Sequence, residues 1–192
     1  MPFIDFHTHR VPAAADVRAV VDGRDTWGIH PWRADAPAAQ PVLEGRLAIG
    51  ECGLDALRGP ALDVQEAVLH RQVLLSEAQR LPLIVHCVKA LDRLLALHRE
   101  WHPSQPWMLH GFRGKPQQLR SLLDAGFYVS FGIQYNPDSL RLCPLDRLML
   151  ETDDAPAPPI RLLYNNVAQV LGMPMDDLCA RMAENYRAFF PV

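Results

Sequence analysis

Short, uninterrupted runs of apolar residues recur along the chain, each followed by a polar residue and a turn. Strands that are buried on both faces have such runs, because neither face meets solvent. The pattern predicts seven strands, at about 3–7, 26–30, 46–51, 82–87, 107–111, 127–132 and 147–152. The segment Val17–Val21 is a candidate for an eighth strand.

Segments with a helical period of apolar residues lie between most of these strands. They predict helices at 62–80, 91–101, 116–125, 160–171 and 174–190. Pro116 suits a first helical turn, and Gly126 and Gly172 stand where helices commonly end. Strands that alternate with helices of this size predict a parallel α/β fold.

The polar residues at the strand ends favour a barrel over an open sheet. A (β/α) barrel gathers its strand ends on one face, whereas an open sheet spreads them along an edge. The chain has no Gly-x-Gly-x-x-Gly motif and no P-loop, so a nucleotide-binding open sheet has little support. We expect a single domain, residues 1–192, that forms a compact TIM (β/α) barrel of seven or eight strands. Only twenty residues separate His9 from His30, so the early part of this barrel is expected to be trimmed or distorted.

Composition and charge limit the kinds of protein that this chain can be. With 192 residues and 49% hydrophobic content, the chain can bury one sizeable core. Its formal net charge of -3 gives no general attraction to nucleic acid, so a phosphate substrate must be bound locally. No signal peptide and no apolar run near 18 residues is present, which predicts a cytoplasmic protein without a membrane span. No obligate protein partner is indicated.

Cys52 and Cys87 are expected to be small buried hydrophobic residues in a reducing compartment.

Histidine and carboxylate recur at the predicted strand ends. His7 and His9 face the same side of one strand, and two neutral imidazoles can hold a divalent metal ion. An isolated pair of this kind is more often two ordinary histidines. Here the later strand ends add His30, Glu51, His86, His110, Glu151 and Asp153. Their number favours a metal site.

The motifs, in this order, resemble those of the TatD-type metal-dependent hydrolases, a branch of the amidohydrolase-like barrels. The resemblance runs through nearly the whole chain. The matching segments are Asp5–His9, Gly28–Pro31, Gly50–Asp55, Pro82–Cys87, His110–Gly114, Gly126–Phe131, Leu150–Asp153 and Asn185–Phe190. The resemblance implies metal-dependent hydrolysis of phosphodiester bonds, often as a deoxyribonuclease, with DNA as one expected substrate.

The resemblance also implies a centre of two divalent ions, such as Zn, Mg or Mn. His7, His9, Glu51 and Asp153 would hold one ion. Glu51, His86 and His110 would hold the other, so that the Glu51 carboxylate bridges. Two such ions can stabilise both the attacking and the leaving oxygen of a phosphoryl displacement. Glu51 and Asp153 are the expected catalytic residues, with Asp153 orienting or deprotonating the attacking water.

Other polar residues are candidates with plain structural alternatives. His30, Lys89 and Arg113 are the candidates for substrate contact, with a turn as the structural alternative for His30 and the solvated surface as the commoner role of Lys89 and Arg113. Asp55 is expected to support a ligand or its own loop. Asp5 is expected to lie too deep to ligate, and the remaining histidines, His70, His98 and His102, to lie on the surface.

The chain departs from the family pattern in several places. It is short, Arg10 and Ala56 replace an apolar and an aromatic residue, and residues 154–158 differ from the usual stretch. Two alternatives therefore stay open: hydrolysis of a carbonyl substrate, such as a cyclic amide or lactone, and a non-catalytic binding protein stabilised by metal. Metal ions polarise carbonyl and phosphoryl oxygens alike. However, Glu51 as the bridging group favours the TatD side, and the six expected ligands are all present.

Overall fold

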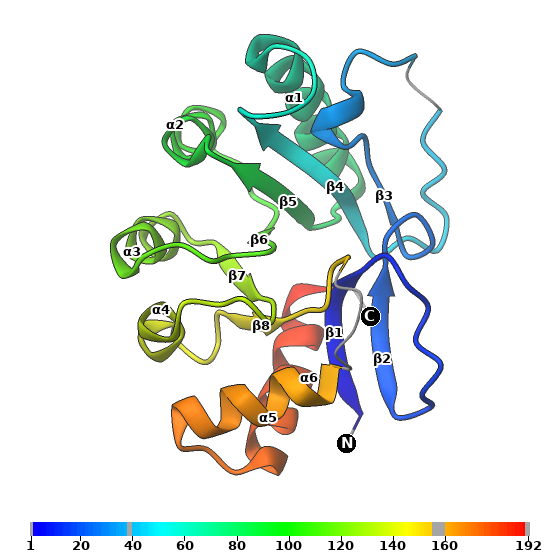
Figure 1. Ribbon diagram of the computed structural model, residues 1–192. Helices are drawn as coiled ribbons and strands as arrows, with labels where there is room; N and C mark the ends of the chain where they lie inside the picture. Colours follow the sequence, from blue (N-terminus) through cyan, green and yellow to red (C-terminus); the bar gives the residue numbers. More distant parts are fainter. Residues whose placement is uncertain (1, 38–39, 155–159, 191–192) are drawn as a thin grey trace.

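The computed structural model describes residues 2–37, 40–154 and 160–190 (Figure 1). The strands are β1 (Phe3–Thr8), β2 (Val17–Val21), β3 (Thr26–Trp27), β4 (Ala48–Asp55), β5 (Leu83–Val88), β6 (Trp107–Leu109), β7 (Tyr128–Phe131) and β8 (Leu148–Leu150). The helices are the short 3-10 helix η1 (Pro31–Arg33), α1 (Leu62–Gln79), α2 (Leu91–Trp101), α3 (Pro116–Asp124), α4 (Pro137–Leu142), α5 (Ile160–Leu171) and α6 (Met175–Phe189). This α/β alternation confirms the predicted fold class.

All the strand pairs are parallel, and they follow the chain order. Strands β3 to β8 form one sheet, and β1 pairs with β2 in a second sheet. A parallel bridge between Thr8 and Asp153 joins the end of β1 to the segment after β8. There the N–H of His9 donates to the Asp153 carbonyl at 3.2 Å, and the N–H of Asp153 donates to the His7 carbonyl at 2.9 Å. The strand ends therefore meet around one centre, as in a barrel.

Helices α1 to α4 lie along the outer side of the six-stranded sheet, and α5 and α6 pack beside β1 and β8 (Figure 1). The outer faces of the strands supply the core, so side chains such as Phe6, Leu83 and Val129 are fully buried. The Phe6 ring packs near those of Tyr186 in α6 and of Phe190, which directly follows α6, with centroid distances of 6.2 and 6.3 Å. This packing fixes β1, which contains His7 and ends directly before His9.

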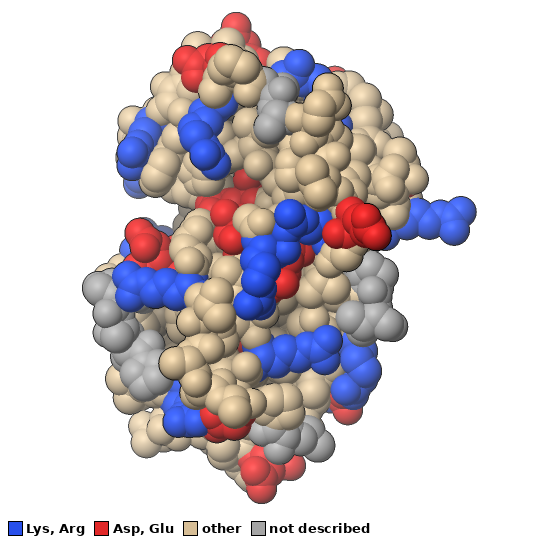
Figure 2. Space-filling model, turned by 90° about the vertical axis from the view of Figure 1, so that its right-hand side faces the viewer, with Lys and Arg blue, Asp and Glu red and all other residues tan. Residues whose placement is uncertain are grey.

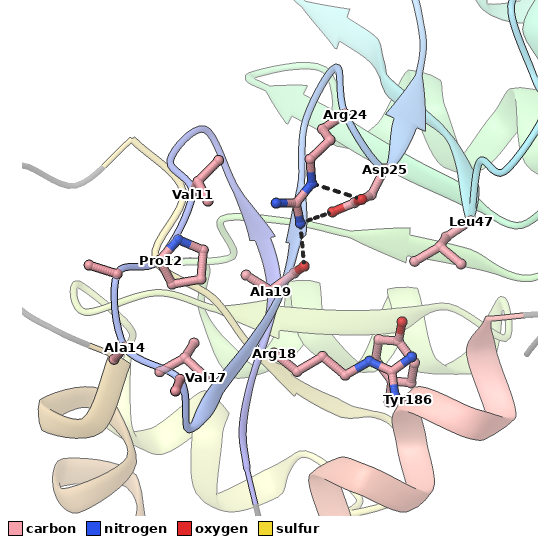
Figure 3. A pocket seen from close by; sticks show the side chains of 12 residues that line it. Val11, Pro12, Ala14, Val17, Arg18, Ala19, Arg24, Asp25, Leu47 and Tyr186 are labelled. Atoms are coloured by element: carbon pink, nitrogen blue, oxygen red, sulfur yellow. Dashed lines mark hydrogen bonds and ion pairs between the residues drawn. The ribbon is translucent and has the colours of Figure 1, made fainter.

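The barrel is trimmed where the sequence predicts it. Between His9 and Leu47 the described residues form no α-helix, and β2 and β3 do not pair with each other. A pocket of about 480 Å³ lies against the uncovered side of β2. Its polar side chains are engaged with one another (Figure 3), since the Arg18 guanidinium lies 4.2 Å from the Tyr186 ring centroid and Arg24 pairs with Asp25 at 2.6 Å.

Three details differ from the sequence prediction, one being that β4 continues to Asp55 instead of ending at residue 51. Strand β3 ends at Trp27 instead of residue 30, because a side chain replaces the next strand partner: Gln72 of α1 accepts from the Ile29 N–H at 2.7 Å and donates to the Ile29 carbonyl at 3.1 Å. Helix α4 was not predicted. Its start is nevertheless encoded, since the Asn136 side chain caps it and Pro137 occupies its first turn.

The charged side chains are mixed on the face shown in Figure 2. In the described part of this face, Lys and Arg alternate with acidic residues and form no continuous basic band. Nucleic acid binding along an extended positive track therefore has no support on this face. Within the described ranges, none of the helices combines the length and apolar character needed to cross a membrane.

The Tyr164 hydroxyl ties α5 to β1, and its removal should destabilise the fold. This buried oxygen accepts from the Ile4 N–H at 3.0 Å and donates to the Ile4 carbonyl at 2.9 Å. We expect Tyr164→Phe to lower the free energy of unfolding by about 1–3 kcal/mol, because it leaves buried polar groups unpaired. Denaturant unfolding measures this. Tyr128→Phe is the control, since the Tyr128 hydroxyl has no hydrogen bond to a described residue. Equal effects of the two changes would contradict the assignment.

Candidate metal centre

Glu51 lies at the centre of the histidines and carboxylates that the strand ends carry. The residue belongs to β4 and is only 5% exposed. Its Oε1 atom lies 2.8 Å from His86 Nδ1, 2.8 Å from His110 Nε2 and 3.1 Å from His30 Nε2. Its Oε2 atom lies 3.4 Å from the Nε2 atoms of both His7 and His9. Each carboxylate oxygen thus faces its own set of imidazoles.

Asp153 completes the set on the Oε2 side of Glu51. Its Oδ1 atom lies 3.5 Å from His9 Nε2 and 3.7 Å from His7 Nε2. The backbone bridge to β1 holds this residue in place. The structure therefore brings together all six residues that the sequence predicts as ligands: His7, His9, Glu51, His86, His110 and Asp153.

The donor set fits divalent metal ions. The His7 ring is completely buried, and neither of its nitrogens has a hydrogen-bond partner among the described residues. A buried polar atom without a partner is costly. Its Nε2 atom is directed at the carboxylates of Glu51 and Asp153, where a shared cation would satisfy all three groups. Imidazole and carboxylate ligands suit Zn and Mn, and carboxylates with water suit Mg.

The charges of the site also favour cations. Burial alone would raise the pKa of Glu51, but the charge of His110 and the close approach of the His110, His30 and His7 rings to the carboxylate outweigh it and hold the pKa far below its usual range. Burial likewise raises the pKa of Asp153, yet the hydrogen bond from His9 and the charges of His110 and His7 lower it to about 2. Both carboxylates are therefore ionised at neutral pH. Hydrogen bonds to Asp153 and Glu51 raise the pKa of His9 to about 10, so a metal ion would displace a proton here.

Three of the histidines turn their second ring nitrogen toward another carboxylate. His9 Nδ1 lies 3.6 Å from Asp22 Oδ2, and His86 Nε2 lies 3.3 Å from Asp55 Oδ2. His110 Nδ1 lies 3.4 Å from Glu151 Oε1, which also accepts from the Gly111 N–H at 2.5 Å. Such carboxylates fix the tautomer and the orientation of a metal-binding imidazole.

Sequence reasoning missed the roles of Asp22 and Glu151. Glu151 is fully buried, and the sequence pattern shows it only as an acid at a strand end. Asp22 directly follows β2, as His9 follows β1 and His110 follows β6, so a polar side chain after an apolar strand is the signal that could have found it. Besides facing His9, its Oδ1 atom accepts from the Glu51 N–H at 3.1 Å and from the Thr26 hydroxyl at 2.9 Å.

His30 faces the centre as a hydrogen-bond donor. The Trp32 N–H donates to His30 Nδ1 at 3.2 Å. Because that nitrogen accepts, the proton of the neutral ring lies on Nε2, which donates to Glu51 Oε1. His30 is therefore placed to donate to an oxygen in the site, and its contact with substrate stays a prediction.

Two cavities open onto the centre and share His86, His110 and Asp153. One has a volume of about 700 Å³ and contains Glu51 and His30. The other has a volume of about 910 Å³, and Lys89 and Arg113 lie on its wall. Both cations are exposed, and Arg113 donates to the Gln134 side chain. The structure thus places both predicted substrate-binding cations beside the site without testing that role.

Most of the remaining residues singled out in the sequence lie where the sequence predicts. Asp5 is buried and accepts from the Thr152 hydroxyl at 2.6 Å, so it lies outside the centre as expected. Asp55 has both expected roles, because it faces His86 and also accepts from the Leu57 N–H at 2.8 Å. His70 and His102 are exposed as predicted, Cys52 is buried as predicted, and Cys87 is only partly buried.

The surface prediction for His98 was wrong. Its ring is half-buried, with its centroid 4.9 Å from that of Trp107 and 4.7 Å from that of Phe127. It lies one residue beyond the buried Leu97 on α2, near the face that packs on the sheet. Burial and the charge of His102 lower its pKa, so the ring favours its neutral form.

Solved structures with the same architecture support the barrel-like fold. The chain superposes on YJJV, a TatD homolog from Escherichia coli, with a TM-score of 0.77, 21% identity and coverage of 94% of this chain and 79% of that one. A TatD family hydrolase from Entamoeba histolytica gives a TM-score of 0.75, 17% identity and coverage of 91% and 75%. At these identities the likeness concerns the fold alone.

Sequence comparison identifies the family. The chain is 33% identical over 201 residues to the 3'-5' ssDNA/RNA exonuclease TatD of Erwinia amylovora, covering 86% of this chain and 77% of that protein. It is 37% identical over 148 residues to the protein of the same name from Rahnella sp., but spans only 56% of its length. It is 30% identical over 214 residues to the uncharacterized metal-dependent hydrolase YcfH of Escherichia coli, covering 95% and 80%. The profile of the family described as TatD related DNase matches residues 22–191, and the chain therefore belongs to this family.

Proposed function

We propose that the protein is a divalent-metal-dependent hydrolase that cleaves phosphodiester bonds in single-stranded nucleic acid. The observation that carries this proposal is the Glu51 carboxylate, which faces imidazole nitrogens on both of its oxygens beside the ionised Asp153. Two of the relatives are named as 3'-5' exonucleases on ssDNA and RNA, and these names support the choice of substrate.

Two divalent ions fit the two sides of Glu51. His7, His9, Glu51 and Asp153 would hold one ion, and Glu51, His86 and His110 the other. When bound, the ions would stabilise the charge on the phosphoryl group and lower the pKa of the attacking water. Zn and Mn suit the imidazole and carboxylate ligands together, and Mg would be held chiefly by the carboxylates with water.

The residues of the chain would orient the reactants. Asp153 is 29% exposed and opens onto both cavities, so its carboxylate can accept a hydrogen bond from the attacking water and hold it in line. The His30 Nε2–H can donate to a phosphoryl oxygen. Lys89 and Arg113, on the wall of the larger cavity, can bind neighbouring phosphates of a nucleic acid strand.

A substrate panel with controlled metal content tests this function. We expect protein loaded with Zn, Mn or Mg to cleave bis(p-nitrophenyl) phosphate and single-stranded DNA, and chelation to remove the activity at least about a hundredfold, because the carboxylates and imidazoles alone do not replace a metal ion. Adding metal back should restore the activity. A cyclic amide and a lactone are the comparison substrates. Metal-loaded protein that leaves every phosphodiester intact would contradict the proposal, whether or not it opens the lactone.

A further inference from the structure

An exposed aromatic ring forms one wall of the 700 Å³ cavity beside Glu51. Trp32 of η1 is 38% exposed. Its indole Nε1–H donates to Asp55 Oδ2 at 2.6 Å, and its centroid lies 4.4 Å from that of His30 in an edge arrangement. Both neighbours belong to the metal centre or face it. The indole is therefore held in a fixed orientation next to the reacting groups.

Arg58 lies over this indole. Its guanidinium carbon is 3.6 Å from the Trp32 ring centroid, and the side chain is exposed on the same cavity. Among the described residues the guanidinium has no acidic partner, whereas Arg93 beside the other cavity is paired with Glu66. One face of the Arg58 guanidinium stacks on the indole, and its donors are free for a ligand.

The loop that carries Arg58 is built to lie close to Trp32. Gly59 has a φ of +92°, and a Cβ atom there would meet the Pro31 carbonyl oxygen at 2.8 Å and Trp32 Cα at 2.9 Å. Only glycine allows this approach of the two backbones. Asp55 adds a second link, because it accepts from the Arg58 N–H at 3.1 Å as well as from the indole. The stack is thus a preformed part of the site.

We propose that the Trp32–Arg58 stack is a subsite for the nucleobase of a nucleotide that flanks the scissile phosphate. Aromatic rings and guanidinium planes are the groups on which proteins stack unpaired bases. A base inside a duplex is covered by its neighbours and its partner strand, so this subsite selects single strands or frayed ends. The inference rests on the proposed function, since it assigns one part of the substrate of the same centre.

The other pocket outside the centre offers no comparable surface. The pocket beside β2 also holds a guanidinium over an aromatic ring, Arg18 over Tyr186, but it contains none of the residues of the metal centre, and its other arginine, Arg24, is paired with Asp25 (Figure 3). Tyr186 itself is only 3% exposed. The Trp32–Arg58 stack therefore combines an exposed ring, an unpaired cation and direct access to the centre.

Pairs of esters with and without a base test the subsite. The substrates are the p-nitrophenyl phosphodiesters of thymidine, at its 5′ or 3′ oxygen, and the same esters of the abasic tetrahydrofuran sugar. We expect metal-loaded wild-type protein to prefer at least one thymidine ester over its abasic counterpart by about tenfold or more in kcat/KM, which is the scale of a base–aromatic stack. Trp32→Ala and Arg58→Lys should each remove most of this preference. Trp32→Phe should retain much of it, because a ring remains.

The abasic esters separate stacking from structural damage. Loss of the bond from Trp32 to Asp55 could disturb the centre, but it would slow both members of a pair equally. Arg33→Ala, which removes a neighbouring cation from the same cavity, should likewise leave the ratio intact. An unchanged ratio in Trp32→Ala or Arg58→Lys overturns the subsite, as does wild-type protein that hydrolyses both members equally. Wild-type protein inert on all the esters contradicts the proposed function instead.

Discussion

Replacing Glu51 by Gln is expected to lower the rate of phosphodiester hydrolysis about a thousandfold or more, the scale seen when a central catalytic group is lost. The substitution keeps the shape of the side chain but removes the charge that faces imidazoles on both oxygens. It should therefore weaken both proposed ion sites at once, because Glu51 is the group they share. The measurement is kcat/KM of metal-loaded protein on bis(p-nitrophenyl) phosphate.

Glu44→Gln is the matched control. Glu44 is exposed and precedes β4, at the end of the strand opposite to the site, so its substitution should leave the rate unchanged within about twofold. Circular dichroism and the unfolding midpoint would show that the Glu51 variant stays folded, which separates loss of the centre from loss of the fold. A folded Glu51→Gln protein with more than a tenth of the wild-type rate would be incompatible with a bridging role.

Asp153→Asn is expected to lower kcat by about a hundred- to ten-thousandfold, the range for a carboxylate that handles a proton in the transition state. The neutral amide oxygen accepts a hydrogen bond from water more weakly than a carboxylate and cannot take its proton, and the substitution also removes the negative charge that faces His9 and His7. The backbone bridge to β1 does not involve the side chain, so the fold should hold.

Asp146→Asn provides the control for this change, because Asp146 is exposed and precedes the opposite end of β8. Steady-state kinetics on the same ester at saturating metal would distinguish the two variants. Should excess metal restore full activity to Asp153→Asn, the residue would be a dispensable ligand without a part in the chemical step.

Much of this site can be predicted from the sequence because parallel strands impose a simple geometry. A polar residue after a doubly buried strand has to emerge at the carboxyl end of the sheet, so His86 and His110 could be placed without coordinates. The pairing of β1 with the segment after β8 brings His9 and Asp153 together. This pairing is a consequence of barrel closure, and the sequence near these two residues contains no signal for it.

The parts that were missed depend on the orientation of individual side chains. The role of Glu151 arises because the His110 ring turns its Nδ1 atom toward it, and ring orientation leaves no mark in the sequence. The Trp32–Arg58 contact joins η1 to the loop after β4, which no local sequence signal indicates. His98 was misplaced because a helix of alternating apolar and charged residues predicts the buried face only to within about one residue.

The metal content of the protein tests the central claim most directly. Wild-type and Glu51→Gln protein would be incubated with Zn, Mn or Mg, freed of unbound ions and analysed by mass spectrometry of the elements. The account predicts two divalent ions per wild-type chain for at least one of these metals, and a loss of at least one in the variant. Wild-type protein that retains no divalent ion under any of these conditions would contradict it.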